Sequence, residues 1–199
     1  MLNFAYQEHY KSYYFDTRNL NLQFPRLSSP QSCDVCIIGA GFQGLSTALE
    51  LAERGKKVIV LEGARVGFGA SGRSGGQAIN GFEEGIDEYI EQVGFEKAKK
   101  LWEMSLEAID IIDERVKKYG IQCDWKKGYA TLALNSRRMD DLIAMEKASR
   151  ETFGYQNMQL WDKSQLQQHV GSDIYVGGLF DSNSGHLHPL NYCLGLAKA

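Results

Sequence analysis

The sequence predicts an α/β fold that opens with a strand–helix–strand unit. A short apolar run over 34–39 has the composition of a strand that is buried on both faces of a parallel sheet. Apolar residues then recur at helical spacing over 42–54, and Gly55 is placed to end this helix as a C-terminal cap. A second apolar run over 57–62 predicts a second buried strand. Together the three elements predict a parallel βαβ unit.

The composition is that of a folded globular protein and excludes several classes of function. The chain has 199 residues, of which 43% are hydrophobic and 24% charged, and its formal net charge is −3. Lys and Arg are scattered, so no basic surface for a nucleic acid is predicted. No stretch reaches the roughly 18 apolar residues of a membrane span, and no apolar signal segment is visible near the start. Four cysteines do not make a disulfide framework, so we expect a cytoplasmic protein.

The remaining chain predicts an irregular segment followed by alternating helices and strands. In order these are an irregular glycine-rich segment over 63–81, a helix over 95–119, a strand over 129–134, a helix over 136–152 and a strand over 175–180. Gly120 is expected to end the long helix, and Ser136 to cap the next one. The last residues, 189–199, predict an amphipathic helix with Pro189 in its first turn. Because two parallel strands are marginal alone, the chain is predicted to be the N-terminal part of a longer protein, with a complete small protein as the alternative.

The glycines after the first strand have the pattern of a dinucleotide-binding turn. The pattern G-x-G-x-x-G lies directly after a strand and opens a helix, which is the context that the motif requires. The first glycine permits a tight turn, the second lets the backbone approach a diphosphate, and the third lets helix and strand pack closely. The helix N-terminus then faces the anion. The predicted cofactor contacts here are Gly39, Ala40, Gly41, Phe42, Gln43 and Gly44.

An acidic residue ends the second strand, 18 residues after the third glycine of the motif. Glu62 is therefore expected to accept hydrogen bonds from ribose hydroxyls, and Gly63 is included with it in the predicted site. A carboxylate there disfavours a 2′-phosphate and argues against NADP. The motif alone does not choose between NAD and FAD.

The glycine-rich segment that follows helps to distinguish between NAD and FAD as the cofactor. Residues 65–77 contain five glycines, two arginines and two serines, so their backbone can approach a flat or anionic ligand. A simple NAD-binding unit would instead continue into a short second helix. An NAD-dependent dehydrogenase explains 39–62 but leaves this segment unused, and it stays open as an alternative.

Residues 34–62 followed by Gly-Phe-Gly-Ala-Ser-Gly-Arg-Ser-Gly-Gly-Gln over 67–77 resemble the D-amino-acid oxidase/glycine oxidase type of FAD-dependent amine oxidoreductases. Within that family the chain is most similar to gamma-glutamylputrescine oxidoreductases, which have a similar Ser-Tyr-Tyr, here 12–14, and a Gly-His-x-His-Pro segment, here 185–189. The resemblance implies an α/β fold in which a Rossmann-like FAD-binding domain is interrupted by an α+β substrate domain. It also implies that family members are longer, so that this chain is truncated at its C-terminus.

The resemblance implies FAD as cofactor and oxidation of a C–N bond of an amine, with gamma-glutamylputrescine as a candidate substrate. A hydride passes to the flavin, the imine hydrolyses, and dioxygen or another electron acceptor takes the electrons, with hydrogen peroxide as the product from dioxygen. Arg65 is a candidate to form a hydrogen bond with a phosphate or ribose of the cofactor. The alternative is that it is a solvated loop residue. The residues implied to lie near the flavin or its ribityl-phosphate are Ala70, Ser71, Arg73, Ser74, Gly75, Gly76 and Gln77. No catalytic acid–base pair and no metal site are identified.

Four segments are expected under this interpretation. They are an N-terminal aromatic arm (1–30), an FAD-binding βαβ unit with its flavin loop (31–82), a helical segment with part of the substrate domain (83–184) and the start of a returning FAD-domain helix (185–199). The arm is expected to cover the active-site mouth, a subunit interface or simply the protein surface. A third function stays open, in which the chain is a truncated, non-catalytic fragment that acts by association.

Cysteine, histidine, tryptophan and acidic residues outside the motif are further candidates for structural or functional roles. Cys33 and Cys36 are expected to be buried strand residues with Cα atoms about 10 Å apart, too far for a disulfide. His186 and His188 could bind a metal, but a turn with one imidazole near the flavin or substrate is the preferred interpretation. The aromatic core candidates are Trp102 and Trp125. The acidic residues Glu83, Glu84, Asp87 and Glu88 predict a solvated helix face that could also attract a cationic amine.

Overall fold

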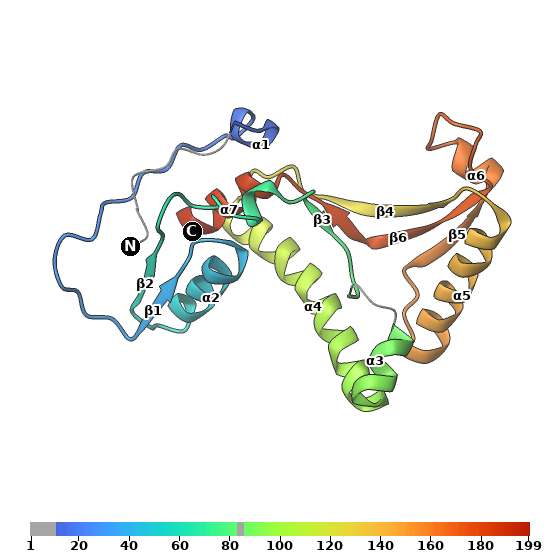
Figure 1. Ribbon diagram of the computed structural model, residues 1–199, viewed down its shortest axis with the longest axis horizontal. Coiled ribbons are helices and arrows are strands. Elements are labelled where there is room, and N and C mark those ends of the chain that lie inside the picture. Colours follow the sequence, from blue (N-terminus) through green and yellow to red (C-terminus); the bar gives the residue numbers. More distant parts are fainter. Residues whose placement is uncertain (1–10, 83–85) are drawn as a thin grey trace. The chain divides into compact units, whose positions relative to one another are not determined.

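The computed structural model describes residues 11–82 and 86–199, which form two compact units (Figure 1). Unit 1 comprises the described residues 11–77 together with Ile112–Trp125 and Leu187–Ala199. Unit 2 comprises Ala78–Ile111 and Lys126–His186. The predicted domain boundaries remain predictions, because compactness alone does not show which segments hold a ligand.

The elements in chain order are α1 (Tyr13–Asp16), β1 (Val35–Ile38), α2 (Phe42–Glu53), β2 (Val58–Leu61), the 3-10 turn η1 (Ser71–Arg73), β3 (Gln77–Ala78), α3 (Ile86–Val93), α4 (Phe95–Tyr119), β4 (Lys126–Ala133), α5 (Ser136–Phe153), β5 (Met158–Asp162), α6 (Lys163–Gln167), β6 (Gly177–His186) and α7 (Pro189–Lys198).

Unit 1 contains the predicted parallel βαβ unit. β1 and β2 pair in parallel with Val35 opposite Val58, and α2 connects them. Gly41 is the N-cap of α2, and its carbonyl oxygen accepts the N–H of Leu45 at 2.9 Å. The predicted order of strand, helix and strand is therefore confirmed.

The expectation that the first strand is buried on both faces is wrong. Val35 and Ile37 are half-buried, whereas Cys36 and Ile38 are exposed, Ile38 to 88%. Side chains alternate between the two faces of a strand, and the Ile37 face is the one that approaches α2. In the described part of the chain β1 and β2 form a two-stranded sheet, so α2 covers one face and leaves the other open.

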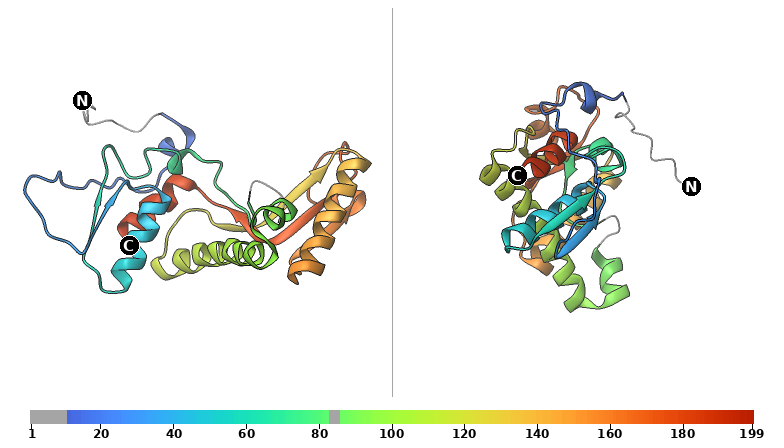
Figure 2. Two further views of the ribbon diagram at one scale, coloured as in Figure 1. Left: turned by 60° about the horizontal axis from the view of Figure 1, so that its bottom comes forward. Right: turned by 90° about the vertical axis from the view of Figure 1, so that its left-hand side faces the viewer.

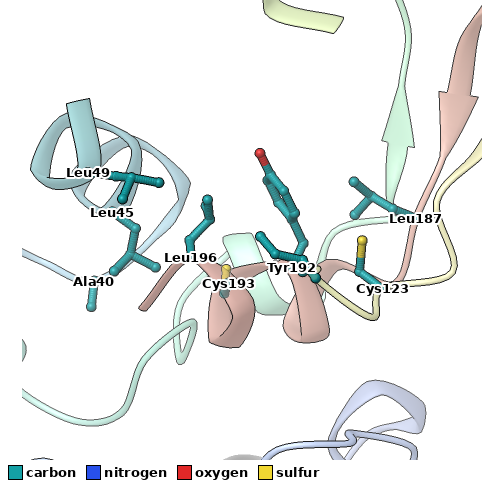
Figure 3. Close-up of a cluster of buried hydrophobic side chains, with 9 residues drawn as sticks. Ala40, Leu45, Leu49, Cys123, Leu187, Tyr192, Cys193 and Leu196 are labelled. Atoms are coloured by element: carbon teal, nitrogen blue, oxygen red, sulfur yellow. The ribbon is translucent and has the colours of Figure 1, made fainter. Parts of the chain in front are cut away.

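The core of unit 1 is built around α7 (Figure 3). Side chains of α2 and of the turn before it lie on one side of this helix, and Cys123 and Leu187 lie near its start. The prediction of an amphipathic helix over 189–199 is wrong in one respect, because every residue from Pro189 to Leu196 is buried. Gly195 permits this close packing, since a Cβ there would stand 2.2 Å from Ile121 Cγ2. A helix that is enclosed by its neighbours is mostly apolar on all sides, and the buried side chain of Asn191 accepts a hydrogen bond from the Asn19 N–H.

The predicted long helix is confirmed as α4, which runs without a break through 25 residues (Figure 2). Its last turns belong to unit 1, where they are bonded to α2. The guanidinium of Arg115 donates to the carbonyl oxygen of Ser46 and to the carboxylate of Glu50, both at 3.4 Å. Lys118 donates to Glu53 at 2.7 Å, and Tyr119 donates to the same carboxylate.

Unit 2 is an antiparallel sheet with α5 packed against it (Figure 1). β6 pairs with β4 on one side and with β5 on the other, and Ala133, Leu142 and Leu179 form the core between sheet and helix. Strand β6 extends to His186, six residues beyond the predicted end at 180. The cap of α5 is Asn135, whose side chain accepts the N–H of Arg138 at 3.0 Å, and not the predicted Ser136.

Several short elements were not predicted from the pattern, namely α1, η1, β3, β5 and α6, whereas α3 contains Asp87 and Glu88 of the expected solvated helix face. Short elements contain too few helical turns or strand alternations for a periodic pattern to be detected in the sequence. Residues 12–19 of the expected aromatic arm pack on unit 1 through α1, which contacts α7. The aromatic residues of the arm within 1–10 lie outside the described residues.

Candidate functional site

The glycine-rich turn between β1 and α2 has the tight geometry that the motif predicts. Gly39 has a φ of +100°, a conformation that side chains disfavour, and its N–H donates to the carbonyl oxygen of Leu61 at 2.7 Å. A Cβ on Gly44 would stand 2.0 Å from the carbonyl oxygen of Gly39 and 3.4 Å from Ile37 Cγ2. The predicted role of Gly44 in close helix–strand packing is therefore confirmed.

The N-terminus of α2 lies against the serine of the glycine-rich loop. Ser71 Oγ accepts the N–H of Phe42 at 3.0 Å, and a Cβ on Gly41 would stand 2.8 Å from the same oxygen. The next two amides, of Gln43 and Gly44, have no hydrogen-bond partner within residues 11–82 and 86–199. Unpartnered amides at a helix N-terminus bind anions such as phosphate. The turn thus fits one end of a diphosphate, with the Ser71 hydroxyl beside it.

The acidic residue at the end of β2 is attached to the same turn. Glu62 Oε2 accepts the N–H of Ala40, and Oε1 accepts the N–H of Ala64, both at 2.8 Å. Ala40 is 2% exposed whereas Glu62 is exposed, so the carboxylate keeps lone pairs toward solvent. These lone pairs fit two donor hydroxyls of a ribose, and Gly63 lies beside them in the chain.

The loop over 65–77 is supported by α7 rather than by its own secondary structure. A Cβ on Gly67 would stand 3.0 Å from Leu190 Cδ1, and one on Gly72 would meet Gly67 O at 2.1 Å. A Cβ on Gly76 would stand 2.0 Å from the carbonyl oxygen of Leu187. Gly67 N–H also donates to Ala40 O at 2.9 Å, which joins the loop to the first turn. Three of the five loop glycines therefore serve chain packing.

The packing roles of Gly67 and Gly72 were not predicted from the sequence. The glycine content of residues 67–77 did indicate close packing, because the segment has more glycines than contact with one ligand explains. Which glycine packs and which faces solvent could not be read from spacing, because the packing partners come from α7, more than a hundred residues later.

The remaining loop residues leave room for a ligand. Gly75 has no neighbour nearer than 4.0 Å to an added Cβ, and Gly69 has none within that distance. Ser74 Oγ accepts the N–H of Gly76 at 3.4 Å, and Arg73 Nε donates to the Gly69 carbonyl at 3.1 Å. Ala70 and Gln77 are exposed, and Arg65 is half-buried. The structure thus brings the predicted residues of the turn and Ser71 together, while their contact with a cofactor stays a prediction.

The cysteine expectation is corrected. All four cysteines are free thiols, but Cys33 is half-buried and precedes β1, and Cys36 is exposed on the open face of that strand. The buried thiols are instead Cys123 and Cys193 in unit 1, and burial raises their pKa values to about 11 and about 12.

Of the two tryptophans, Trp102 is confirmed as a core residue at 6% exposed. Its ring stacks on Phe153 and meets Tyr155 edge-on. Trp125 is half-buried rather than fully enclosed, because its indole N–H reaches the Asp113 carboxylate at 2.9 Å.

The two histidines lie in different settings. His186 is exposed at the end of β6, whereas His188 is buried and caps α7. No group of three or more His, Cys, Asp and Glu in the described ranges is placed to hold a metal ion. Of the acidic residues, Asp87 and Glu88 are exposed in the first turn of α3, whereas 83 and 84 lie outside the described residues. Among the helices described, none combines the length and apolar character that a membrane crossing needs.

Comparisons with known proteins identify relatives of the chain. It is 82% identical over its full length to a probable oxidoreductase, OrdL, of Haemophilus influenzae, covering 46% of that protein. It is 42% identical over 192 residues to the gamma-glutamylputrescine oxidoreductase of Escherichia coli, covering 96% of this chain and 45% of that one. The chain therefore spans less than half the length of these relatives.

A solved structure shares the fold. The L-amino acid deaminase of Proteus myxofaciens superposes with a TM-score of 0.73 at 24% identity, covering 90% of this chain and 38% of that one. The family model for FAD-dependent oxidoreductases of the DAO type matches residues 34–199. The predicted fold class is confirmed, and FAD is the cofactor of this family. The chain belongs to the DAO family of FAD-dependent oxidoreductases.

Proposed function

We propose that this chain forms the FAD-binding part of an amine-oxidising flavoenzyme. The observation that most supports this is the pairing of two features at one turn. The unpartnered amides of Gln43 and Gly44 suit a diphosphate, and Glu62 is held at the adjacent Ala40 with lone pairs free for a ribose.

The roles proposed for the residues follow from their positions. The α2 amides and the Ser71 hydroxyl hold the diphosphate, Glu62 holds the ribose, and the open backbone at Gly75 lies toward the flavin side of the cofactor. When bound, FAD supplies two-electron chemistry, taking a hydride equivalent from the carbon next to nitrogen and passing electrons to dioxygen, with hydrogen peroxide as product, or to another acceptor.

The proposed substrate is a primary or secondary amine, and gamma-glutamylputrescine is the first candidate. The likeness to a gamma-glutamylputrescine oxidoreductase over 96% of the chain supports it. After oxidation the imine is expected to hydrolyse to a carbonyl product and a free amine. The described residues supply no acid–base pair that we assign to catalysis.

The cofactor part of the proposal is tested by titration. The purified chain is titrated with FAD and, separately, with NADH, following flavin and nicotinamide fluorescence. We expect saturable binding of FAD and none of NADH. Binding of NADH alone would favour the NAD-dependent dehydrogenase, and binding of neither would reject the proposed function for this chain.

A matched pair of variants ties FAD binding to the site. Ser71→Ala removes the hydroxyl beside Gly41, whereas Ser136→Ala changes an exposed serine in α5 of unit 2. Loss of one hydrogen-bonding group is expected to weaken FAD binding about tenfold in the first variant and to leave it unchanged in the second. Equal affinities in both would remove Ser71 from the site.

The amine part of the proposal needs its own measurement. FAD-loaded protein is mixed without oxygen with gamma-glutamylputrescine, putrescine or glycine, and the visible flavin absorbance is followed. Bleaching with the first amine is the expected result. Retained FAD without bleaching by any of the three would contradict the amine function while leaving the cofactor assignment intact.

A second candidate is a non-catalytic chain that acts by association. The open face of β1 favours it, because Cys36 and Ile38 are both exposed there, Ile38 to 88%, and an apolar sheet face without a covering layer can serve as an interaction surface. Light scattering distinguishes this candidate from the FAD-binding flavoenzyme. The associating chain is expected to form oligomers, and Ile38→Lys is expected to abolish them. A monodisperse monomer that binds FAD would contradict it.

A further inference from the structure

A short N-terminal strap lies on the start of α7. We use this name for residues 12–19, which include α1. Asn19 N–H donates to Asn191 Oδ1 at 3.0 Å, and the Asn19 side-chain amide donates to the carbonyl oxygen of Gln122. The ring of Tyr14 meets the His188 ring edge-on, with centroids 5.1 Å apart. The strap is therefore attached to two segments of unit 1 that lie more than a hundred residues away in the chain.

His188 is the residue at which these segments meet. It is 7% exposed, and each of its polar atoms has a partner. Its backbone N–H donates to Cys123 O at 2.6 Å, its Nδ1 accepts the N–H of Asn191 at 3.1 Å, and its Nε2 lies 3.0 Å from Thr17 Oγ1. One side chain thus caps α7 and contacts the strap.

The hydrogen bonds determine which ring nitrogen of His188 bears the proton. Because Nδ1 accepts a backbone N–H, it has no hydrogen of its own, so the neutral ring has its hydrogen on Nε2. Nε2–H then donates to Thr17 Oγ1, and the Thr17 hydroxyl donates to the Tyr13 carbonyl at 2.6 Å. The donors and acceptors form one consistent chain only in this tautomer.

The helix that His188 caps is also the support of the glycine-rich loop. Leu190 and Cys193 lie against Gly67, and Leu190 also lies 3.1 Å from the position of a Cβ on Gly72. We propose that His188 is a positioning residue that couples the N-terminal strap to the loop over 65–77 through α7, and that it acts as the neutral Nε2–H tautomer. The effect on FAD rests on the proposed function, whereas the attachment of the strap does not.

Protonation of His188 opposes this arrangement. A second ring hydrogen, on Nδ1, would point at the Asn191 N–H, and the N-terminus of a helix disfavours a cation. Burial lowers the pKa of His188, against a weaker opposing effect of the Asp124 carboxylate in the loop before β4. The other titratable groups that face the ring are Tyr13 and Tyr14 of the strap. The stabilisation by neutral His188 is therefore complete above the unfolded-state pKa of about 6.5 and is lost as the pH falls below it.

The attachment is tested with a matched pair at Thr17. Thr17→Val keeps the shape and removes the hydroxyl, whereas Thr17→Ser keeps the hydroxyl. Hydrogen exchange at the Asn19 amide and tryptic cleavage after Arg18 report whether the strap is attached. Thr17→Val removes two hydrogen bonds, the one from His188 Nε2 and the one to the Tyr13 carbonyl, so exchange and cleavage are expected to rise about threefold to tenfold in Thr17→Val and less than twofold in Thr17→Ser. Equal protection in both variants would overturn the role of His188 in holding the strap.

A second variant separates capping from attachment. His188→Asn can still cap α7 but cannot reach Thr17, so it is expected to release the strap, and adding Thr17→Val to His188→Asn is expected to release it less than Thr17→Val does in the wild type. After correction for intrinsic exchange, acidification below about pH 6.5 should release the strap in the wild type but not in His188→Asn. An Nδ1–H tautomer in the nitrogen NMR spectrum, or an acid response that persists in His188→Asn, would overturn the proposal.

FAD affinity tests the coupling to the loop. Thr17→Val is expected to raise the Kd for FAD at least twofold, and Thr17→Ser to leave it unchanged. Strap release with an unchanged Kd would overturn the coupling. Absence of FAD binding in the wild type would contradict the proposed function instead, while the exchange and cleavage results would still decide the role of His188 in the strap.

Discussion

Glu62 Oε2 accepts the backbone N–H of Ala40 at 2.8 Å, so the end of β2 is fixed to the residue between the first two glycines of the turn. The two groups are 22 residues apart in the chain. The carboxylate therefore holds the turn in place and still presents lone pairs to solvent. A structural role and the proposed cofactor-binding role therefore fall on one side chain.

Glu62→Gln is expected to weaken FAD binding about tenfold. The amide retains one acceptor oxygen but loses the charge that strengthens bonds from ribose hydroxyls, a difference of about 1–2 kcal/mol. Flavin fluorescence titration measures it. Asp34→Asn is the matched control, because the Asp34 carboxylate accepts the Lys57 N–H at 2.8 Å at the other end of the strands. An equal loss in both variants would mean that Glu62 acts through stability alone.

Alanine substitutions at the adjacent loop glycines Gly75 and Gly76 are expected to differ in their effects on stability and on FAD binding. Gly76→Ala should lower the free energy of unfolding by about 3 kcal/mol, because φ is +70° and the Cβ would stand 2.0 Å from the Leu187 carbonyl oxygen. Gly75→Ala meets open space, so its stability should change by less than about 0.5 kcal/mol while FAD binding weakens. Chemical denaturation with FAD titration measures both. The prediction fails where Gly75→Ala destabilises the fold as much as Gly76→Ala.

Stability is expected to fall on the alkaline side of about pH 9 because of two buried thiols. Burial raises the pKa of Cys123 to about 11 and that of Cys193 to about 12. The unfolded thiols ionise near pH 8.5 and the folded ones do not, so each lowers the unfolding free energy by about 1.4 kcal/mol per pH unit above that point.

Denaturant unfolding at about pH 9 and about pH 10 measures this slope. Cys193→Ala should make it shallower by one thiol, whereas Cys36→Ala, at an exposed position, should leave it unchanged. The slopes are compared rather than the absolute stabilities, because removing a buried side chain also leaves a cavity. A Cys193→Ala slope identical to that of the wild type would contradict the assignment.

The buried carboxylate of Asp181 in unit 2 is expected to contribute several kcal/mol to the free energy of unfolding. Asp181 is 5% exposed and accepts hydrogen bonds from the side chains of Asn80, Tyr155 and Ser184 at 2.7, 2.8 and 3.0 Å. Asp181→Ala leaves these donors without their acceptor, so the free energy of unfolding should fall by about 3–5 kcal/mol.

Asp141→Ala is the matched control for Asp181→Ala. Its carboxylate pairs with Arg138 at the surface of α5, with both side chains more than half exposed, and the expected change is below about 0.5 kcal/mol. Thermal or denaturant melts compare the two variants. A loss at Asp181 no greater than that at Asp141 would show that the network contributes little to stability.

Local patterns identified the parts of the fold that are defined by neighbours in the chain. The βαβ unit, α4 and the packing role of Gly44 followed from apolar spacing and from the position of one glycine motif between strand and helix. These features depend on residues within a few turns of each other, where steric and periodic rules apply directly.

The glycine-rich turn, its acidic partner Glu62 and, through the segment 67–77, the family could all be inferred from the sequence. The three-dimensional packing was needed to show that α7 is buried from Pro189 to Leu196, that Gly67 and Gly76 pack against distant segments of unit 1, and that His188 joins the strap to α7. This difference follows from separation along the chain. These contacts join residues that are more than a hundred positions apart. Local periodicity cannot predict which distant segment packs against a glycine or against the ring of a histidine.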